Sequence, residues 1–323
     1  MRVGIEASID RSLLGGFAGL DLVRIPAEPD EDIAVDFWVA ALAPPSQRRQ
    51  WPHLRGVKAV QGLWAGVEAL RPLIPDDVVL CNARGVHDAP TAEWAVTATL
   101  AMQKYLPFYF DLQRRADWAG KDRAEDIYLL SEGARREPDC PVLVEEVADK
   151  TVLIIGYGSI GAAVEARLAP FGCKFLRVAR SARADGPVVV APVSALDELL
   201  PQADIVILTT PLTSETRGLI DGARIARMKR GALLVNAGRG AVVVTDALTR
   251  ALNEGRIRAA VDVTDPEPLP PDHPLWRAPN LLITPHLATD TPRFMGRAFA
   301  FAAEQAQRFA RGEKLLNILQ GEY

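Results

Sequence analysis

The sequence predicts an α/β protein with two domains, each built on a doubly wound parallel sheet. The chain has 323 residues, which is enough to form two separate cores. Apolar runs of strand length alternate with helical stretches in both halves. A glycine-rich turn, Gly156–Gly161, joins a strand to a helix near the middle of the chain. Together these observations favour parallel α/β architecture.

The composition is that of an ordinary globular protein, with 49% hydrophobic and 24% charged residues. A net charge of −4 with both signs mixed gives no basic surface for nucleic acid or an anionic membrane. We see neither a signal peptide nor a run of the roughly 18 to 20 apolar residues that span a membrane. Cys81, Cys140 and Cys173 are widely spaced, which fits reduced thiols rather than disulfides or a zinc site. We therefore expect a cytoplasmic protein with no metal site.

The first ninety residues are expected to form a small parallel α/β unit with a flavodoxin-like fold. Its candidate strands are Ile33–Leu42, Val57–Leu63 and Val78–Asn82, separated by proline- and glycine-containing segments. A final helix, Pro292–Phe309, is expected to return to this unit. The predicted domains are therefore residues 1–96 with 288–323, and residues 97–287.

A long helix is predicted from Thr91 to about Arg115. It is too apolar to be solvated on every side, so we expect it to be buried between domains or between subunits. This favours a homodimer. The stretch Trp118–Lys150 is charged and is left unassigned.

From Thr151 onward the pattern is again β-α-β, as in a second doubly wound sheet. Ser194 and Asp221 are expected to be helix N-caps, and Thr245-Asp246 to open another helix. The expected strands are Thr151–Ile155, Lys174–Ala179, Ile205–Thr209, Ala232–Asn236, Ala259–Val263 and Leu281–Thr284.

The glycine turn is typical of a site for a dinucleotide pyrophosphate in a Rossmann-like domain. Gly156 permits the tight turn, Gly158 leaves room for phosphate, and Gly161 lets the following helix pack closely on the strand. The unpaired N–H groups of that helix, expected over Ala162–Pro170, would face the anion. A glycine-rich surface turn is the alternative. The strand before it and the second strand at Lys174–Ala179 favour the cofactor site.

Arg239, Glu267 and His286 each follow a predicted strand, where an α/β sheet binds its ligands. Taken singly, each residue has an alternative explanation. Arg239 could be a solvated arginine, Glu267 could belong to a rigid acidic loop, and His286 could be a core histidine whose hydrogen bonds are satisfied. Their common place beyond strand ends, in a chain with a dinucleotide turn, favours function.

Beyond these features, the sequence resembles the D-2-hydroxyacid dehydrogenase family, in particular its glyoxylate/hydroxypyruvate reductases. The resemblance covers nearly the whole chain. The motifs that carry it are Gly156–Gly161, Thr210–Ile220, Asn236–Gly240, Asp262–Pro270, His273–Trp276 and Pro279–His286.

The resemblance implies that Arg239, Glu267 and His286 are the catalytic residues. A guanidinium can hold the carboxylate of a 2-oxo acid and polarise its carbonyl. An imidazolium at His286 can protonate the alkoxide that forms as hydride arrives from the nicotinamide. Glu267 would bond the other ring nitrogen, orienting the ring and stabilising its protonated form.

The cofactor is predicted to be NADPH rather than NADH. NAD enzymes place an acidic residue after the second strand, but Ala179 stands there, followed by Arg180, Ser181 and Arg183. The missing carboxylate removes repulsion against a 2′-phosphate, and Arg180 can pair with that group. The alternative is a solvated basic loop with NAD bound through other contacts. The resemblance adds further cofactor contacts at Ser159, Ile160, Ser181, Thr210, Pro211, Thr216, Ala237, Gly238 and Asp262.

The segment Gln61–Glu68 matches the family's substrate loop. By resemblance, backbone N–H groups of Ala65 and Gly66 would bind the substrate carboxylate. Trp64 stands in place of a small residue, either as an aromatic wall beside the substrate or as a tryptophan packed between domains. For His87 we favour a structural or surface role.

The sequence thus predicts a reductase of small 2-oxo acids such as glyoxylate or hydroxypyruvate, and, by resemblance, a dimer. The same scaffold acting on another acid, as in phosphite dehydrogenases, is a second hypothesis. A non-enzymatic, nucleotide-sensing protein like the family's corepressors is a third. Formate oxidation is disfavoured, because that branch carries an amide at the position of Glu267.

Overall fold

The structure is a computed structural model that describes residues 1–123, 144–319 and 321. Cys140 therefore lies outside the described residues. The helices are α1 Pro44–Gln50, α2 Asp88–Gln103, α3 Leu106–Arg114, α5 Ser159–Leu168, α6 Leu196–Leu199, α7 Gly222–Arg227, α8 Thr245–Asn253 and α9 Phe294–Ala310. The strands are β1 Arg2–Glu6, β2 Asp21–Ile25, β3 Ile33–Ala34, β4 Phe37–Val39, β5 Leu54–Arg55, β6 Ala59–Gln61, β7 Val79–Cys81, β8 Thr151–Ile155, β9 Lys174–Ala179, β10 Arg183–Asp185, β11 Val188–Pro192, β12 Ile205–Leu208, β13 Leu233–Asn236, β14 Arg258–Val261 and β15 Leu281–Ile283.

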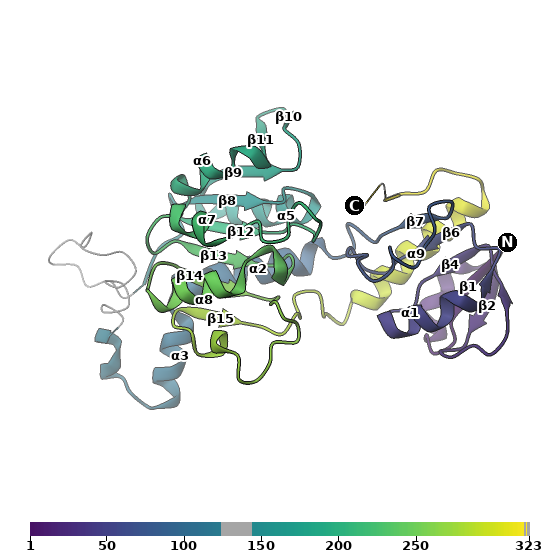
Figure 1. Cartoon of the computed structure of the whole chain (residues 1–323), viewed down its shortest axis with the longest axis horizontal. Coiled ribbons are helices and arrows are strands. Elements are labelled where there is room, and N and C mark those ends of the chain that lie inside the picture. The colour runs from purple at the N-terminus through teal and green to yellow at the C-terminus, as the bar shows by residue number, and fades with distance from the viewer. Residues whose placement is uncertain (124–143, 320, 322–323) are drawn as a thin grey trace. The chain divides into compact units, whose positions relative to one another are not determined.

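The chain forms two compact units, each around its own parallel sheet (Figure 1). The first unit consists of Met1–Asp88 with Asp290–Tyr323, and the second of Ala89–Thr289. In the structure the first boundary falls at the start of α2, whereas the sequence placed it at residues 96 and 97.

The first unit has a five-stranded sheet in the order β2-β1-β4-β6-β7, with every pair parallel. Counted along the chain, this is the 2-1-3-4-5 order of flavodoxin-like folds. The predicted strand Ile33–Leu42 is wrong as a single element, because it divides into β3 and β4. Asp36 lies between them, and its carboxylate accepts the backbone N–H of Arg2 at 2.9 Å.

The C-terminal helix α9 belongs to the first unit, as the sequence predicted. Its apolar face packs Phe299, Ala302 and Ala306 into the core that also contains Ile5 and Phe37. Because α9 lies more than two hundred residues beyond the strands it covers, this unit is discontinuous in sequence.

The second unit has an eight-stranded sheet in the order β10-β11-β9-β8-β12-β13-β14-β15. Apart from the antiparallel hairpin β10–β11, every pair is parallel. Without β10, the order along the chain is 3-2-1-4-5-6 with one added strand, which is the Rossmann arrangement. The six predicted strands are confirmed to within two residues at their ends, as is the predicted fold class. The hairpin was not predicted.

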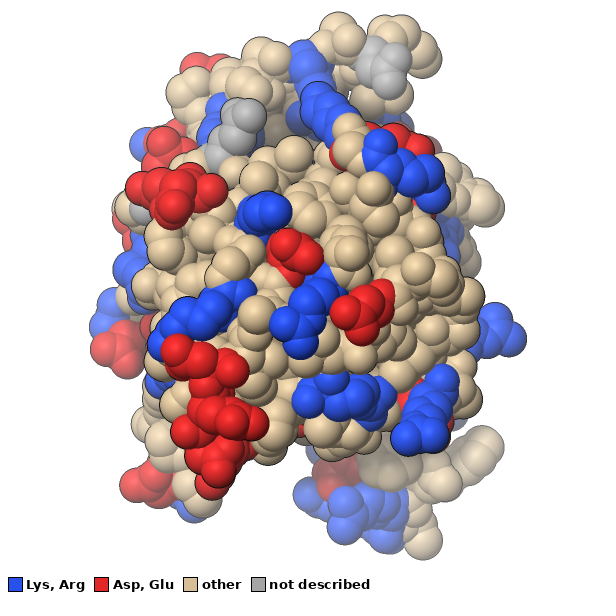
Figure 2. All heavy atoms as spheres, turned by 90° about the vertical axis from the view of Figure 1, so that its right-hand side faces the viewer, with Lys and Arg blue, Asp and Glu red and all other residues tan. Residues whose placement is uncertain are grey.

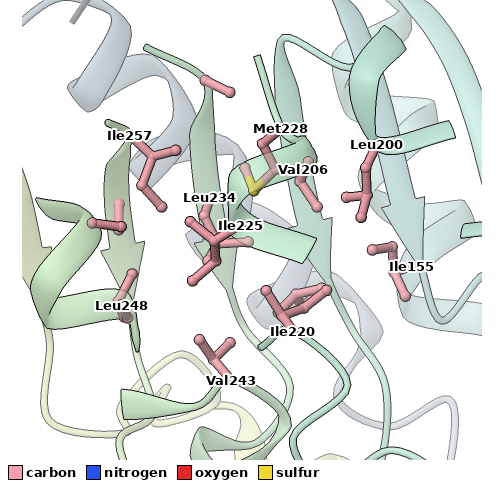
Figure 3. Close-up of a cluster of buried hydrophobic side chains, with 14 of the residues drawn as sticks. Ile155, Leu200, Val206, Ile220, Ile225, Met228, Leu234, Val243, Leu248 and Ile257 are labelled. Carbon is pink, nitrogen blue, oxygen red and sulfur yellow. The ribbon is translucent and has the colours of Figure 1, made fainter. Parts of the chain in front are cut away.

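Alternate residues of the central strands pack on opposite faces of the second sheet. Figure 3 shows one face, where Ile155, Val206 and Leu234 meet apolar side chains from the segments that carry Ile225 and Leu248. On the other face Val152, Ile154 and Ile207 pack against α2 and α5. Burial on both faces explains the continuous apolar runs of these strands.

Helix α2 corrects one expectation from the sequence. Its residues Ala92, Ala95, Ala98 and Met102 pack on the sheet of its own unit, and this packing accounts for its apolar face. The predicted helix to Arg115 is also wrong as a single helix, because α2 ends at Gln103 and α3 begins at Leu106. Tyr105 takes a left-handed conformation (φ 50°) between them.

Pro107 explains this break, because proline lacks an N–H and its ring clashes with the preceding helical turn. Among the predicted caps, Asp221 is confirmed: its side chain accepts the N–H of Arg224 at 2.9 Å. Ser194 is not a cap. It lies inside the 3-10 helix Val193–Ala195, which Pro192 precedes. Helix α8 opens at Thr245 as predicted.

Figure 2 shows one face of the molecule, on which basic and acidic side chains are interspersed. Across residues 1–123 and 144–319 no helix has the length and hydropathy needed to cross a membrane. The same described residues contain no cluster of three or more His, Cys, Asp or Glu side chains suited to a metal ion. Cys81 and Cys173 are free thiols, and burial raises the pKa of Cys81 to about 12.

Candidate active site

The turn between β8 and α5 has the geometry of a phosphate site. Gly156 has a φ of 94°, and a Cβ there would lie 2.7 Å from the backbone nitrogen of Thr210. A Cβ on Gly161 would lie 3.0 Å from Ile154, so a larger residue would separate helix from strand. Beside Gly158 the space is open, the nearest atom to a Cβ being 3.9 Å away. Gly158 is also the N-cap of α5 and supplies no side-chain cap, which leaves N–H groups of the helix for an anion.

Thr210, just beyond β12, lies beside this turn. It is 7% exposed, and within the part of the chain that the structure describes its Oγ1 has no hydrogen-bond partner. A Cβ on Gly238 would approach the carbonyl oxygen of Thr210 to 2.7 Å. Three turns, after β8, β12 and β13, therefore meet at the carboxyl edge where the strand order reverses. This is the place at which α/β sheets bind dinucleotides, and the open space at Gly158 and the unpartnered hydroxyl fit such a ligand.

The end of β9 carries no carboxylate. Ala179 is the last strand residue, and Arg180 and Ser181 follow it with exposed side chains. The acidic residue Glu165 on α5 is paired with Arg177 of β9 through two hydrogen bonds. Both side chains are only 16% exposed. The carboxylate of Glu165 is therefore already occupied by this ion pair.

Arg239 lies in a turn that hydrogen bonds among neighbouring residues hold in shape. The buried side chain of Asn236, at the end of β13, accepts the N–H of Gly238 at 3.1 Å and donates to the carbonyl of Arg239 at 3.0 Å. The Arg239 Nη1 donates to the carbonyl of Gly238 at 2.8 Å. The side-chain amide of Asn236 therefore holds the turn that carries Arg239, directly after strand β13.

Gly240 brings the Arg239 turn against the segment that carries Glu267. A Cβ at Gly240 would lie 1.9 Å from the carbonyl oxygen of Thr264. Any side chain would overlap this oxygen, so only glycine fits at position 240. The charge of Arg239 helps to lower the pKa of Glu267 and opposes the rise in the pKa of His286.

His286 and Glu267 form a direct pair through the histidine Nδ1 and a carboxylate oxygen of Glu267. The hydrogen bond to Glu267 raises the pKa of His286 above its usual value, against burial and against the charge of Arg239. Burial raises the pKa of Glu267, but its bond to His286 and their charge attraction outweigh burial and lower it. The pair therefore favours an imidazolium beside a carboxylate, and it uses the Nδ1 of the ring and not the Nε2.

Asp262 holds the turn on which His286 stands. This residue is 2% exposed, and its Oδ1 accepts the Thr284 hydroxyl at 2.6 Å and the N–H of Leu287 at 3.0 Å. Its Oδ2 accepts the N–H of Ala288 at 2.9 Å. His286 takes a left-handed conformation there, with a φ of 52°.

Sequence reasoning placed Asp262 among the cofactor contacts, and its role in this turn was not foreseen. The sequence did contain a signal for this role. Asp262 comes directly after an apolar strand, and the next expected strand ends in Thr284. Two further residues were not singled out from the sequence. Asn236 lies between a strand and a glycine, a position typical of an Asx turn, and Tyr157 is discussed below.

The remaining predicted cofactor residues lie on the same edge of the second unit. Ser159 and Ile160 form the first turn of α5, and Ala237 follows β13. Thr216 has its hydroxyl engaged within a turn, donating to the carbonyl of Pro211 at 2.7 Å.

The predicted substrate residues Trp64, Ala65 and Gly66 form a half-buried loop after β6 in the first unit. The Trp64 carbonyl accepts the N–H of Ala83 at 2.9 Å, and the Ala65 carbonyl accepts the Asn82 side chain at 2.9 Å. With these carbonyls anchored, the direction of the peptide groups in the loop is fixed.

The Trp64 ring stacks on Phe294 and His87, with ring centroids 4.4 and 5.4 Å away. His87 is 3% exposed and its Nε2 lies 3.2 Å from the carbonyl oxygen of Leu63. Its place is thus structural and not on the surface.

The chain is similar to known dehydrogenases and reductases. A family profile described as D-isomer specific 2-hydroxyacid dehydrogenase, NAD binding domain, matches residues 101–288. A glyoxylate reductase of Thermofilum pendens is 34% identical over 239 residues, which cover 73% of this chain and 66% of that protein.

Two solved structures match nearly the whole chain. One is an NADPH-dependent glyoxylate/hydroxypyruvate reductase of Sinorhizobium meliloti in complex with NADP and sulfate (26% identity, TM-score 0.79, 99% of this chain and 98% of that one). The other is a D-isomer specific 2-hydroxyacid dehydrogenase of Xanthobacter autotrophicus in complex with NADPH and MES (28% identity, TM-score 0.78, 99% and 97%). With the profile covering more than half of the chain, the protein belongs to the D-isomer specific 2-hydroxyacid dehydrogenases, a family of oxidoreductases.

Proposed function

We propose that the protein is an NADPH-dependent reductase of small 2-oxo acids, with glyoxylate and hydroxypyruvate as the first candidates, and that the product is the D-2-hydroxy acid. The observation that carries this proposal is the His286–Glu267 pair beside Arg239, at the same sheet edge as the glycine turn. The relatives named for glyoxylate and hydroxypyruvate reduction support the choice of substrate.

In the proposed reaction each residue has a separate task. Arg239 binds the substrate carboxylate and draws electron density from the neighbouring carbonyl. When bound, the reduced nicotinamide would supply the hydride that reduces the carbonyl carbon. His286, protonated because Glu267 raises its pKa, transfers its Nε2 proton to the carbonyl oxygen as the C–O double bond becomes single. Glu267 keeps the ring oriented and stabilises its charge until the proton leaves.

The cofactor is proposed to lie with its pyrophosphate at the N-terminus of α5, against Gly156, Gly158 and Gly161. NADPH is preferred over NADH in this proposal because β9 ends in Ala179 and is followed by Arg180 and Ser181, while Glu165 is held by Arg177. Both solved relatives described above were crystallised with NADP or NADPH, which supports the same preference.

For the first unit we propose the substrate-binding role, with N–H groups of Ala65 and Gly66 directed to the substrate carboxylate. The fixed peptide groups of this loop support that role, because ordered donors need no reorganisation when an anion binds.

A homodimer also remains a proposal. Helix α2 no longer supports it, but α3 presents Leu106 and Phe110 to solvent, 53% and 59% exposed. Light scattering on gel-filtered protein is expected to give twice the chain mass, and the mass of a single chain would contradict the dimer.

The decisive experiment is steady-state kinetics on a panel of 2-oxo acids with both NADPH and NADH. We expect turnover of glyoxylate or hydroxypyruvate with a higher kcat/KM for NADPH. His286→Ala is expected to lower kcat/KM by roughly 10²- to 10⁴-fold, the usual contribution of a general acid. Equal activity of this variant and the unchanged protein would contradict the role of His286. Binding of NADP⁺ without turnover of any acid would favour a nucleotide-sensing protein instead.

A further inference from the structure

Tyr157, the residue between the first two glycines of the cofactor turn, lies between two arginines. The Cζ of Arg177 lies 5.6 Å from the centroid of the Tyr157 ring, and the Cζ of Arg183 lies 5.8 Å from it. Both distances are within the range of a cation–π interaction. Arg183 also donates a hydrogen bond from Nη2 to the backbone carbonyl of Tyr157.

The two arginines differ in what else they bind. The guanidinium of Arg177 is held by Glu165, with its Nε 2.6 Å from a carboxylate oxygen and its Nη2 bonded to the other. The charge of Arg177 is therefore balanced by Glu165, and its guanidinium is fixed in place. Hydrogen bonding to Glu165 raises the pKa of Arg177, and burial raises that of Tyr157, so the arginine stays charged and the phenol neutral.

Arg183 has an exposed side chain, and among the described residues no carboxylate is paired with it. It begins β10, three residues after Arg180. A long exposed arginine samples many rotamers, and ordering it on ligand binding lowers affinity. The Tyr157 ring and carbonyl restrict Arg183 in advance, while its remaining N–H groups stay available.

We propose that Tyr157 is a positioning residue that holds Arg183 ready to bind the 2′-phosphate of NADPH, as a second guanidinium beside Arg180. A phosphate dianion accepts paired N–H donors from guanidinium groups, and two fixed arginines bind it more strongly than one. Tyr157 then contributes to the choice of cofactor without touching the 2′-phosphate itself. This inference rests on the proposed preference for NADPH.

The test compares Tyr157→Leu with the matched control Tyr157→Phe, which keeps the ring and loses only the hydroxyl. Dissociation constants for NADP⁺ and NAD⁺ are measured by titration calorimetry, which needs no substrate. For Tyr157→Leu we expect the NAD⁺-to-NADP⁺ ratio of dissociation constants to fall about fivefold, the factor that corresponds to one cation–π contact. For Tyr157→Phe we expect this ratio to stay within about twofold of the unchanged protein.

Arg183→Gln provides the second arm, because this exposed residue can change without disturbing a core. We expect it to lower the same ratio by about tenfold, as loss of one charged contact to phosphate should. Adding Tyr157→Leu to Arg183→Gln should change the ratio little further, because the tyrosine then has no arginine to position. Should Tyr157→Leu fail to fold in a thermal melt, Tyr157→Met serves in its place.

The outcomes separate this inference from the proposed function. If the unchanged protein binds NAD⁺ at least as tightly as NADP⁺, the proposed cofactor preference is wrong and the inference falls with it. If NADP⁺ is preferred and Tyr157→Leu weakens both cofactors equally, the preference stands and Tyr157 merely supports the turn. Additive effects of Tyr157→Leu and Arg183→Gln would likewise overturn the positioning role.

Discussion

The backbone N–H of His286 donates to the backbone carbonyl of Asp262 at 2.7 Å, across two neighbouring parallel strand ends. The Asp262 carboxylate binds the same turn again, at the N–H groups of Leu287 and Ala288. The conformation that carries the proposed general acid is therefore set by a buried acidic residue outside the trio of Arg239, Glu267 and His286.

Asp262→Asn should loosen the His286 turn. An amide nitrogen in place of one carboxylate oxygen faces an N–H donor, so at least one of the backbone N–H groups loses its acceptor. An unsatisfied buried group costs about 1–3 kcal/mol, so urea denaturation should show a loss of that size. We also expect kcat to fall. Asp265→Asn, at an exposed carboxylate on the same loop, is the control and should change neither quantity. Wild-type stability in Asp262→Asn would contradict the proposed support.

Glu267→Gln should move the pH dependence of reduction. Glu267 raises the pKa of His286, so the imidazolium persists to higher pH, and kcat/KM should fall only as pH rises through that raised pKa. An amide removes the charge and most of the shift. We therefore expect the alkaline fall of kcat/KM to begin at lower pH, with roughly tenfold lower activity at neutral pH.

The measurement is kcat/KM against pH for both proteins, with saturating NADPH. The same linkage applies to folding. The raised pKa of His286 stabilises the fold at pH values below its unfolded pKa, and this contribution is lost as pH rises through the folded pKa. An alkaline limb at the same pH in Glu267→Gln would show that the carboxylate does not control the proton of His286.

Arg258→Met should destabilise the second unit. Arg258 is 3% exposed and donates to the carbonyls of Met102 and Gly231, both at 3.2 Å, and to the Gln103 side chain at 2.7 Å. It thus satisfies carbonyl groups at the end of α2, where positive charge is favoured. Leaving these buried acceptors unpaired should lower the free energy of unfolding by about 3 kcal/mol. Arg250→Met on the exposed face of α8 should change it by less than about 0.5 kcal/mol.

Trp64→Ala tests the proposed aromatic wall. The ring is held by Phe294 and His87, so its removal should both open the substrate loop and lower stability. We expect larger 2-oxo acids to gain in kcat/KM relative to glyoxylate. Trp64→Phe keeps a ring for the stack and should retain the original order of substrates. If Trp64→Ala is less stable but ranks the acids as before, the tryptophan only packs within its unit.

The sequence was sufficient wherever one local pattern had one physical meaning. Strand β8 was predicted at its observed bounds, because a strand buried on both faces is a continuous apolar run ended by polar residues or turns. Strand β9 was also predicted at its observed bounds. The sequence also indicated why glycine is needed at three positions of the turn, because a side chain would be unfavourable at each for a different steric reason: Gly156, Gly158 and Gly161. The positions of Arg239, Glu267 and His286 followed from their places after strands.

Tertiary structure decided what depends on partners distant in sequence. The apolar face of α2 has the same pattern whether it covers a sheet or a subunit, and only packing on Val152 and Ile154 shows which. Strand β1 has just three buried residues, too short a run to predict, and its place between β2 and β4 is set by these neighbouring strands. Likewise, an acidic residue after a strand can bind a ligand or hold a turn. Asp262 holds the His286 turn because folding aligns two strand ends some twenty residues apart, and hydrogen bonds depend on that alignment.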